Sequence, residues 1–189
     1  MPDGADPATS SRGAAAPWQP AGSRGLPQGV RLVRLAAGHA DALRAFEVEN
    51  RGYFSAHISD RGDAFFAEFD ERLAELLVDQ DAGELHFHVL VEDDGQIVGR
   101  VNLVDVADGS AELGYRIAER WTGRGLATAA VRELCELAAG EYGLKELRAG
   151  TNLTNVGSQK VLERTGFVRV GEREYGGRPG IEYVLALGV

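Results

Sequence analysis

The 189-residue chain is 44% hydrophobic and 26% charged, a balance that indicates one folded domain with a tail and excludes a wholly disordered or membrane-embedded chain. Its formal net charge of −9 argues against nucleic-acid binding, because such binding depends on Lys and Arg neutralising phosphates. No stretch approaches the roughly 18 apolar residues of a membrane span, and no signal peptide is recognisable.

The N-terminal segment, residues 1–29, differs in composition from the rest of the chain. It holds five of the six prolines together with glycine, alanine and serine, and it shows no apolar periodicity. Such a segment buries too little apolar surface to offset the entropy lost on ordering. We therefore predict a disordered tail over residues 1–29 and a single domain over residues 30–189.

Hydrophobic periodicity predicts regular secondary structure throughout that domain. The helix over 125–139, for example, follows from four apolar residues spaced four, four and three apart: Leu126, Ala130, Leu134 and Leu137. Strands are predicted at 30–35, 85–91, 96–104, 111–117, 146–151, 167–175 and 181–187, and helices at 39–50, 63–78, 125–139 and 155–164. The resulting order is βααβββαβαββ, which indicates an α/β (α+β) protein.

Three features allow both a structural and a functional interpretation. Twelve acidic residues and only two arginines lie in the segment 60–94, which is either a solvated helix face or an attractor for a cationic amine or basic protein tail. His86 and His88 share a strand face without an evident third ligand, so no metal site is expected. The single cysteine, Cys135, is expected to be a buried hydrophobe; lacking a disulfide partner, it makes a cytoplasmic location the default.

A glycine-bearing turn, Thr122-Gly123-Arg124-Gly125-Leu126-Ala127-Thr128, leads from the predicted strand 111–117 into a helix. The start of a helix presents unpaired N–H groups and the positive end of a dipole, and so accepts phosphate oxygens. Such a turn can also be a tight connection and nothing more. It lacks the Gly-Lys-Ser/Thr end of a nucleoside-triphosphate loop and the third glycine of a dinucleotide loop.

A second motif follows about 27 residues later, from Asn152-Leu153-Thr154-Asn155 to Thr165-Gly166-Phe167. Together the two motifs resemble the GNAT acetyltransferase superfamily, whose acetyl-CoA site combines a [Gln/Arg]-x-x-Gly-x-[Gly/Ala] turn with a later asparagine helix that ends in Gly-Phe. The resemblance covers about residues 30–187. It implies a mixed, mainly antiparallel central sheet flanked by helices.

Within the superfamily the chain is most similar to the RimJ/RimL-type branch, which acetylates the N-termini of ribosomal proteins. The similarity lies in Glu49-Asn50-Arg51-Gly52-Tyr53-Phe54, in Glu112-Leu113-Gly114-Tyr115, and in Asn155 with Ser158. It implies acetyl-CoA as donor, a primary amine such as a protein N-terminus as acceptor, no metal, and a monomer or homodimer. A small-molecule amine (an antibiotic or polyamine) as acceptor, or a non-catalytic acetyl-CoA-binding module, are the alternatives.

The resemblance also implies site residues. Acceptor contacts are expected from Asn50, Arg51, Tyr53 and Phe54. Cofactor contacts are expected from Arg116, Ile117, Ala118, Thr122, Gly123, Arg124, Gly125, Leu126, Ala127, Thr128, Asn152, Asn155 and Ser158. Two of these have a simpler interpretation as well, because Asn155 suits a helix N-cap and Ser158 suits an ordinary helix surface.

Two positions depart from the family pattern. Thr122 replaces the Gln or Arg at the head of the turn, so cofactor binding is expected to depend more on the backbone. Leu162 stands where many relatives carry the tyrosine that protonates the departing thiolate, and Ser158 is the expected substitute. Glu112, on the strand before the turn, is the expected base, acting through water, although it can equally be a solvated carboxylate.

Overall fold

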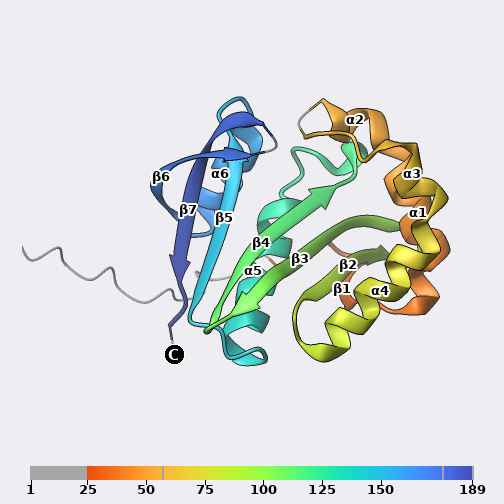
Figure 1. The fold of residues 1–189 in the computed structure, drawn as a ribbon, viewed down its shortest axis with the longest axis horizontal. Coiled ribbons are helices and arrows are strands. Elements are labelled where there is room, and N and C mark those ends of the chain that lie inside the picture. Colours follow the sequence, from red (N-terminus) through yellow and green to blue (C-terminus); the bar gives the residue numbers. More distant parts are fainter. Residues whose placement is uncertain (1–24, 57, 176, 189) are drawn as a thin grey trace, which may run out of the picture.

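The computed structural model describes residues 25–56, 58–175 and 177–188, which form one sheet with helices on both faces (Figure 1). The sheet has the strand order β1-β2-β3-β4-β5-β7-β6. Its strands are β1 (Val30–Arg34), β2 (His86–Glu92), β3 (Ile97–Ala107), β4 (Ser110–Ile117), β5 (Glu146–Asn152), β6 (Val168–Tyr175) and β7 (Arg178–Ala186). The helices are η1 (Ala37–His39), α1 (Ala40–Glu49), α2 (Arg51–Ser55), α3 (Gly62–Ala67), α4 (Phe69–Ala82), η2 (Glu119–Trp121), α5 (Leu126–Gly140) and α6 (Val156–Arg164).

This architecture confirms the predicted mixed, mainly antiparallel sheet, because among the described strands only the β4–β5 pair is parallel. The helical region between β1 and β2 differs from the prediction. The single helix predicted over 63–78 is two helices, α3 and α4, separated at Glu68 by backbone angles of φ −101° and ψ 19°. A short helix, α2, also follows α1 directly. A one-residue break leaves the apolar spacing unchanged, so periodicity cannot detect it.

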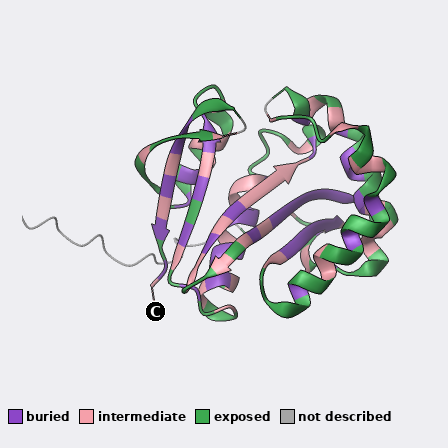
Figure 2. Ribbon diagram, in the orientation of Figure 1, coloured by how far each residue is buried: buried purple, intermediate pink, exposed green. Residues whose placement is uncertain are grey.

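The two faces of the sheet bury different clusters. Alternate residues of β2 point to opposite faces, so Phe87 and Val89 pack with residues of α1 and α4, whereas Leu90 packs in the cluster built around α5. Cys135 lies in the α5 cluster, where burial raises the pKa of its thiol to about 12, as expected of an unreactive structural cysteine. Figure 2 shows buried central strands and an exposed edge strand, β6.

Most of the predicted tail, residues 1–24, lies outside the described residues. Of the five described residues before β1, Leu26 packs against the α5 cluster. The boundary at residue 29 therefore stays a prediction. Among the residues that the structure describes, no helix has both the length and the apolar character needed to cross a bilayer.

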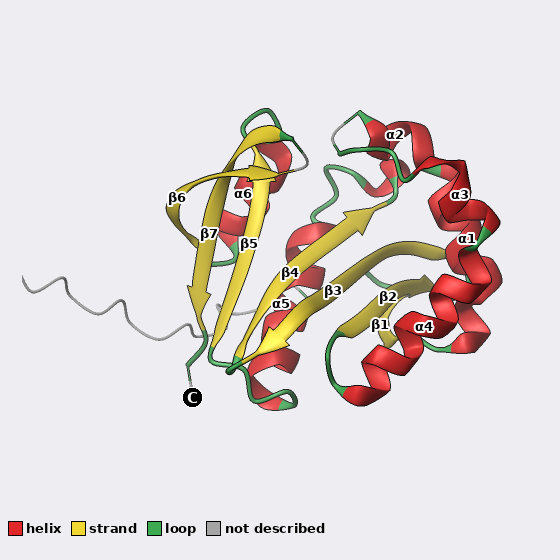
Figure 3. Cartoon of the chain, viewed as in Figure 1, coloured by secondary structure: helices red, strands yellow, loops and turns green. Residues whose placement is uncertain are grey.

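The parallel strands β4 and β5 form a fork. They pair over only three positions, where Ser110, Ala111 and Glu112 lie opposite residues 146–148. Beyond that point they diverge, and Figure 3 shows β4 running toward α2 while β5 runs alongside β7. The facing edges of β4 and β5 are thus unpaired beyond the base of the fork. This opening is where the candidate site lies.

Candidate active site

A cavity of about 550 Å³ occupies the fork. Its walls come from the diverging parts of β4 and β5, the first turn of α5, the helix α6 and the region of α2. Thirteen predicted site residues line it: Tyr53, Phe54, Arg116, Ile117, Thr122, Gly123, Gly125, Leu126, Ala127, Thr128, Asn152, Asn155 and Ser158. The structure therefore brings both sequence motifs to one concave surface.

The glycine-bearing turn forms one end of this cavity. Gly123 and Gly125 have positive φ values of 76° and 82°, and a Cβ atom at either position would meet no atom within 4 Å. Gly125 is the N-cap of α5 and supplies no side-chain hydrogen bond to the helix. The N–H groups of the first turn of α5 are thus left without a side-chain cap, which suits an anionic ligand.

The second helix at the cavity, α6, begins differently. The Asn155 side chain is its N-cap, because its Oδ1 accepts a hydrogen bond from the Ser158 N–H at 3.0 Å. Asn155 also lines the cavity. The capping role expected on physical grounds is therefore present, and it leaves the residue within reach of a ligand. Capping also fixes Ser158 in the first turn of α6.

Ser158 has a partner, Tyr115, that was not among the predicted site residues. The hydroxyl oxygens of Ser158 and Tyr115 lie 2.9 Å apart, and Tyr115 comes from β4 across the fork. Burial raises the pKa of the Tyr115 phenol to about 12, although its hydrogen bond with Ser158 opposes that shift. Tyr115 is therefore protonated near neutral pH. The nearby Leu162 is buried and forms part of the apolar wall.

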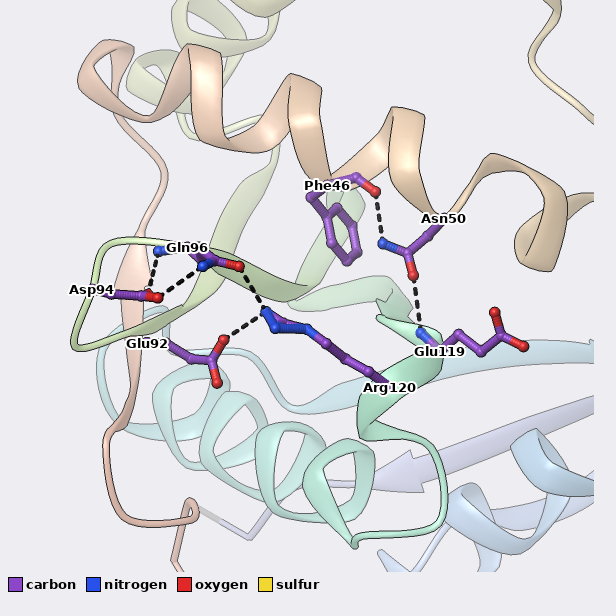
Figure 4. A network of polar contacts seen from close by, with 7 residues as sticks. All are labelled: Phe46, Asn50, Glu92, Asp94, Gln96, Glu119 and Arg120. Carbon is purple, nitrogen blue, oxygen red and sulfur yellow. Dashed lines mark hydrogen bonds and ion pairs between the residues drawn. The ribbon is translucent and has the colours of Figure 1, made fainter.

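A network of polar contacts fixes the segment just before the turn (Figure 4). The Asn50 amide donates to the backbone of α1 and accepts from the Glu119 N–H, both at 2.9 Å. Arg120 donates to Glu92 at 2.6 Å and to Gln96 at 3.2 Å. The predicted acceptor residue Asn50 is thus buried and bonded to backbone outside the cavity lining, where it holds η2 in place.

On the face of the sheet covered by α1, one carboxylate binds two arginines. Glu47 lies 2.9 Å from Arg100 Nε and 2.8 Å from Arg116 Nη1, and all three side chains are largely buried. The Arg100 contact is within ion-pair distance but lacks hydrogen-bond alignment. Burial lowers the Arg100 pKa to about 9, which leaves the group charged at neutral pH. The Arg116 guanidinium also lies 5.2 Å from the Phe54 ring centroid.

The remaining predicted residues lie apart from the main cavity lining. Arg51 forms ion pairs with Asp60 at 2.6 Å and Asp63 at 2.8 Å, beside a small adjoining hollow. Ala118 is buried. The Arg124 guanidinium stacks 5.4 Å from the Trp121 ring centroid. The structure thus brings none of these three side chains into the fork.

Glu112 sits at the closed base of the fork, where β4 and β5 are still paired, and is not among the lining residues. Its charge nevertheless acts on Tyr175, which does line the cavity: burial, and secondly Glu112, raise the pKa of that phenol. Tyr175 lies directly over Gly150, where no side chain would fit. A role for Glu112 through water stays a prediction.

Three cationic side chains that the sequence interpretation missed line the cavity: Lys160, Arg164 and Arg178. Lys160 and Arg164 are four residues apart on α6 and so share one helix face, a spacing that could have identified them. Arg178 and Tyr175 come from β7 and β6, and nothing local in the sequence places those strands beside the fork. The cavity thus combines an uncapped helix start with positive charge.

Comparison with known proteins identifies the family to which the chain belongs. The family model of the acetyltransferase (GNAT) domain matches residues 30–168. The probable N-acetyltransferase YjcK of Bacillus subtilis (strain 168) is 30% identical over 149 residues, which cover 72% of this chain and 79% of that protein.

Solved structures share the fold. Ribosomal-protein-S5-alanine acetyltransferase from Vibrio fischeri superposes with a TM-score of 0.79 at 20% identity, over 84% of this chain and 93% of that chain. Mycobacterium smegmatis RimJ, in complex with a CoA-disulfide, has a TM-score of 0.73 at 20% identity, over 83% of this chain and 81% of that chain. The chain therefore belongs to the GNAT acetyltransferase family.

Proposed function

We propose that the protein transfers the acetyl group of acetyl-CoA to a primary amine, with the α-amine of a protein N-terminus as the favoured acceptor. The observation that carries the proposal is the fork between β4 and β5. One cavity there joins an uncapped helix start, at Gly125, to the hydroxyl pair of Ser158 and Tyr115. Phosphate binding and thioester chemistry would thus occupy adjoining parts of one cavity.

The donor would be held mainly by backbone and by fixed charge. The first-turn N–H groups of α5 would bind the pyrophosphate, because Gly123 and Gly125 place no side chain in the way. Lys160, Arg164 and Arg178 would add positive charge toward the phosphates. Unpaired peptide groups on the inner edge of β4 would polarise the thioester carbonyl.

The reaction balances without a covalent intermediate on the protein. The neutral amine attacks the acetyl carbonyl, a C–N bond forms, the C–S bond breaks, and the amine loses one proton to water, with Glu112 as the proposed distant base. Ser158 donates its proton to the departing thiolate and regains one from Tyr115, which lies 2.9 Å away and is reprotonated from water. Buried Cys135 takes no part.

An α-amine acceptor fits a site whose proposed base, Glu112, acts from a distance and through water. Deprotonating an α-amine with a pKa near 8 costs about 1.4 kcal/mol at pH 7, whereas a lysine side chain costs about 4.6 kcal/mol. Because no carboxylate is among the residues that line the cavity, the acceptor with the lower pKa is favoured. The name of the structurally similar ribosomal-protein-S5-alanine acetyltransferase is consistent with a protein acceptor.

The proposal is tested by incubating the full chain with acetyl-CoA and a panel of amines, and measuring both free thiol and acetylated product. The panel contains peptides with free α-amines, the same peptides with blocked N-termini and internal lysines, and small polyamines. We expect product with free N-termini. Acetyl-CoA binding without turnover on any amine would instead favour a non-catalytic module, an alternative that the apolar Leu162 wall motivates.

A further inference from the structure

The charge of the buried cluster around Glu47 is not balanced. Arg100 alone would neutralise this carboxylate, and it is the more buried of the two arginines, with 10% of its side chain exposed against 15% for Arg116. Arg116 therefore adds a net positive charge to a largely buried group. Buried charges are costly unless they are paired, so a surplus cation at a cavity wall suits an anionic ligand.

Arg116 is held in place by its partners, yet some of its N–H donors are left for a ligand. Its Nη1 donates to Glu47 at 2.8 Å, and its guanidinium stacks on Phe54. The residue lines both the main cavity and the small hollow beside α2. A planar guanidinium has five N–H donors, and the hydrogen bond to Glu47 occupies one of them, which leaves donors for a ligand. Its orientation is thus set before any ligand binds.

Arg116 places this charge on the side of the cavity formed by the end of α1 and by α2, which we call the acceptor side because the predicted acceptor residues lie there. Successive residues of a strand point to opposite faces, and its neighbour Tyr115 points to Ser158 on the α6 side. Arg116 points instead toward α1 and α2. A ligand group that meets Arg116 therefore approaches the cavity from the α1–α2 face of β4, the face opposite the Ser158–Tyr115 pair.

A second cation stands nearby. Arg61 lines the small hollow with Arg116, and burial together with the charge of Arg116 lowers the Arg61 pKa. Among the described residues Arg61 makes no ion pair, while Arg51 is held by Asp60 and Asp63. The acceptor side is thus locally positive within the described residues, although the whole chain carries −9.

We propose that the acceptor carries a carboxylate close to its amine and that this carboxylate pairs with Arg116. The inference rests on the proposed function and narrows its substrate class. Two sources share the chemistry: a protein N-terminus with an acidic residue in its first positions, and a free α-amino acid. Polyamines are disfavoured, because a second ammonium group would face the surplus cation.

The experiment compares kcat/KM for acceptors that differ only in charge. Hexapeptides with a free N-terminal serine carry Asp, Asn or Lys at the second position; free aspartate and spermidine complete the set. We expect the Asp peptide to exceed the Asn peptide by at least about tenfold, which corresponds to 1.4 kcal/mol, with the Lys peptide lower still. Free aspartate turning over faster than the Asp peptide would identify an amino acid as the source.

Variants of Arg116 test whether the preference for the Asp peptide depends on this residue. Arg116→Gln removes the surplus charge but leaves the Glu47 and Arg100 pair, and should bring the Asp/Asn ratio to about one; Arg116→Lys should restore part of it, because Lys keeps the charge without the planar fork. Arg178→Gln is the matched control: it removes a cation from the opposite side of the cavity and should leave the ratio unchanged. Thermal melts identify variants that fail to fold, and kcat/KM ratios are compared at saturating acetyl-CoA, because Arg178→Gln removes a proposed phosphate contact.

Turnover of all peptides at equal rates, or a preference for the Lys peptide or spermidine, would overturn the carboxylate inference while leaving the acetyltransferase proposal intact. Should no amine be acetylated, the proposed function is contradicted separately. In that case the affinities of the Asp and Asn peptides for the wild-type protein, measured with coenzyme A present, decide the inference. Equal affinities would count against it.

Discussion

The hydroxyl group of Tyr53 lies 3.1 Å from the hydroxyl group of Thr122, which joins α2 to the head of the glycine-bearing turn. Thr122 is the position where family members carry a long Gln or Arg. Here the short side chain is met by a tyrosine from the acceptor side. The two halves of the proposed ternary complex therefore share a direct contact in the protein itself.

Tyr53→Phe tests that contact. A neutral hydrogen bond contributes about 0.5–1.5 kcal/mol, so we expect KM to rise about two- to tenfold for both acetyl-CoA and the acceptor, with a small change in melting temperature because the pair is exposed. Steady-state kinetics with each substrate varied in turn provides the measurement. Unchanged KM values for both substrates would show that the contact is incidental.

Gly125→Ala should weaken acetyl-CoA binding. The left-handed backbone at φ 82° costs a residue with a Cβ about 1–2 kcal/mol, and the added methyl group would stand at the helix start that we propose binds the phosphates. Gly143→Ala is the control, because Gly143 also has a positive φ, of 62°, and open space around it, but does not line the cavity. Both variants should lose stability, and only Gly125→Ala should show a raised Kd in calorimetric titration.

Ser158→Ala should lower kcat by about 100-fold or more, the usual contribution of a positioned proton donor. Tyr115→Phe should lower it less, because Ser158 then retains its hydroxyl but loses its proton source. Because the Tyr115 pKa is raised to about 12, its ionisation should not limit the rate at moderately alkaline pH. Acetyl-CoA affinity, measured alongside kcat, should change little; a loss of affinity with kcat unchanged would assign Ser158 to binding alone.

Stability should fall as the solution is acidified because of His88. Its ring is buried, its Nε2 lies 2.9 Å from the Tyr142 hydroxyl, and burial, then the charges of His86 and Arg34, lower its pKa to about 4. In the unfolded chain the His88 pKa is near 6.5. The free energy of unfolding should therefore be highest above that pH and should decrease toward pH 4 by roughly 3 kcal/mol, because the unfolded chain binds the proton more readily. Denaturant unfolding at several pH values measures this.

His88→Gln separates this effect from general acid denaturation, because the substituted side chain does not titrate. The variant should show a shallower fall in unfolding free energy between pH 6.5 and 4 than the wild type. An identical slope in both proteins would assign the pH dependence to other groups.

The parts of the site that depend on residues close together in the chain could be predicted from the sequence. Gly123 and Gly125 before an apolar helix indicate an open helix start, and Asn155 followed by Ser158 indicates a capped one, because each pattern depends on residues within one turn. The sheet type followed from the family resemblance. These predictions needed no knowledge of which strands meet.

The fork and its contents could not be predicted in this way. The pairing of β4 with β5 stops after three positions, which depends on twist and on the packing of helices far apart in the chain. Glu47, Arg100 and Arg116 come from three elements, so no spacing indicates their contact. Tyr115 was visible in its motif, but its partner Ser158 is 43 residues away.

The brevity of the β4–β5 pairing has a consequence for how the protein opens. The strands β1–β4 and β5–β7 are joined within the sheet by one short ladder and otherwise through the side chains packed around α5, so amide hydrogen exchange can follow them as two units. A molecule bound along the fork spans both units. Its binding free energy would therefore couple them, and the amides of β5 and β7 would become as slow to exchange as those of β3 only when the fork is filled.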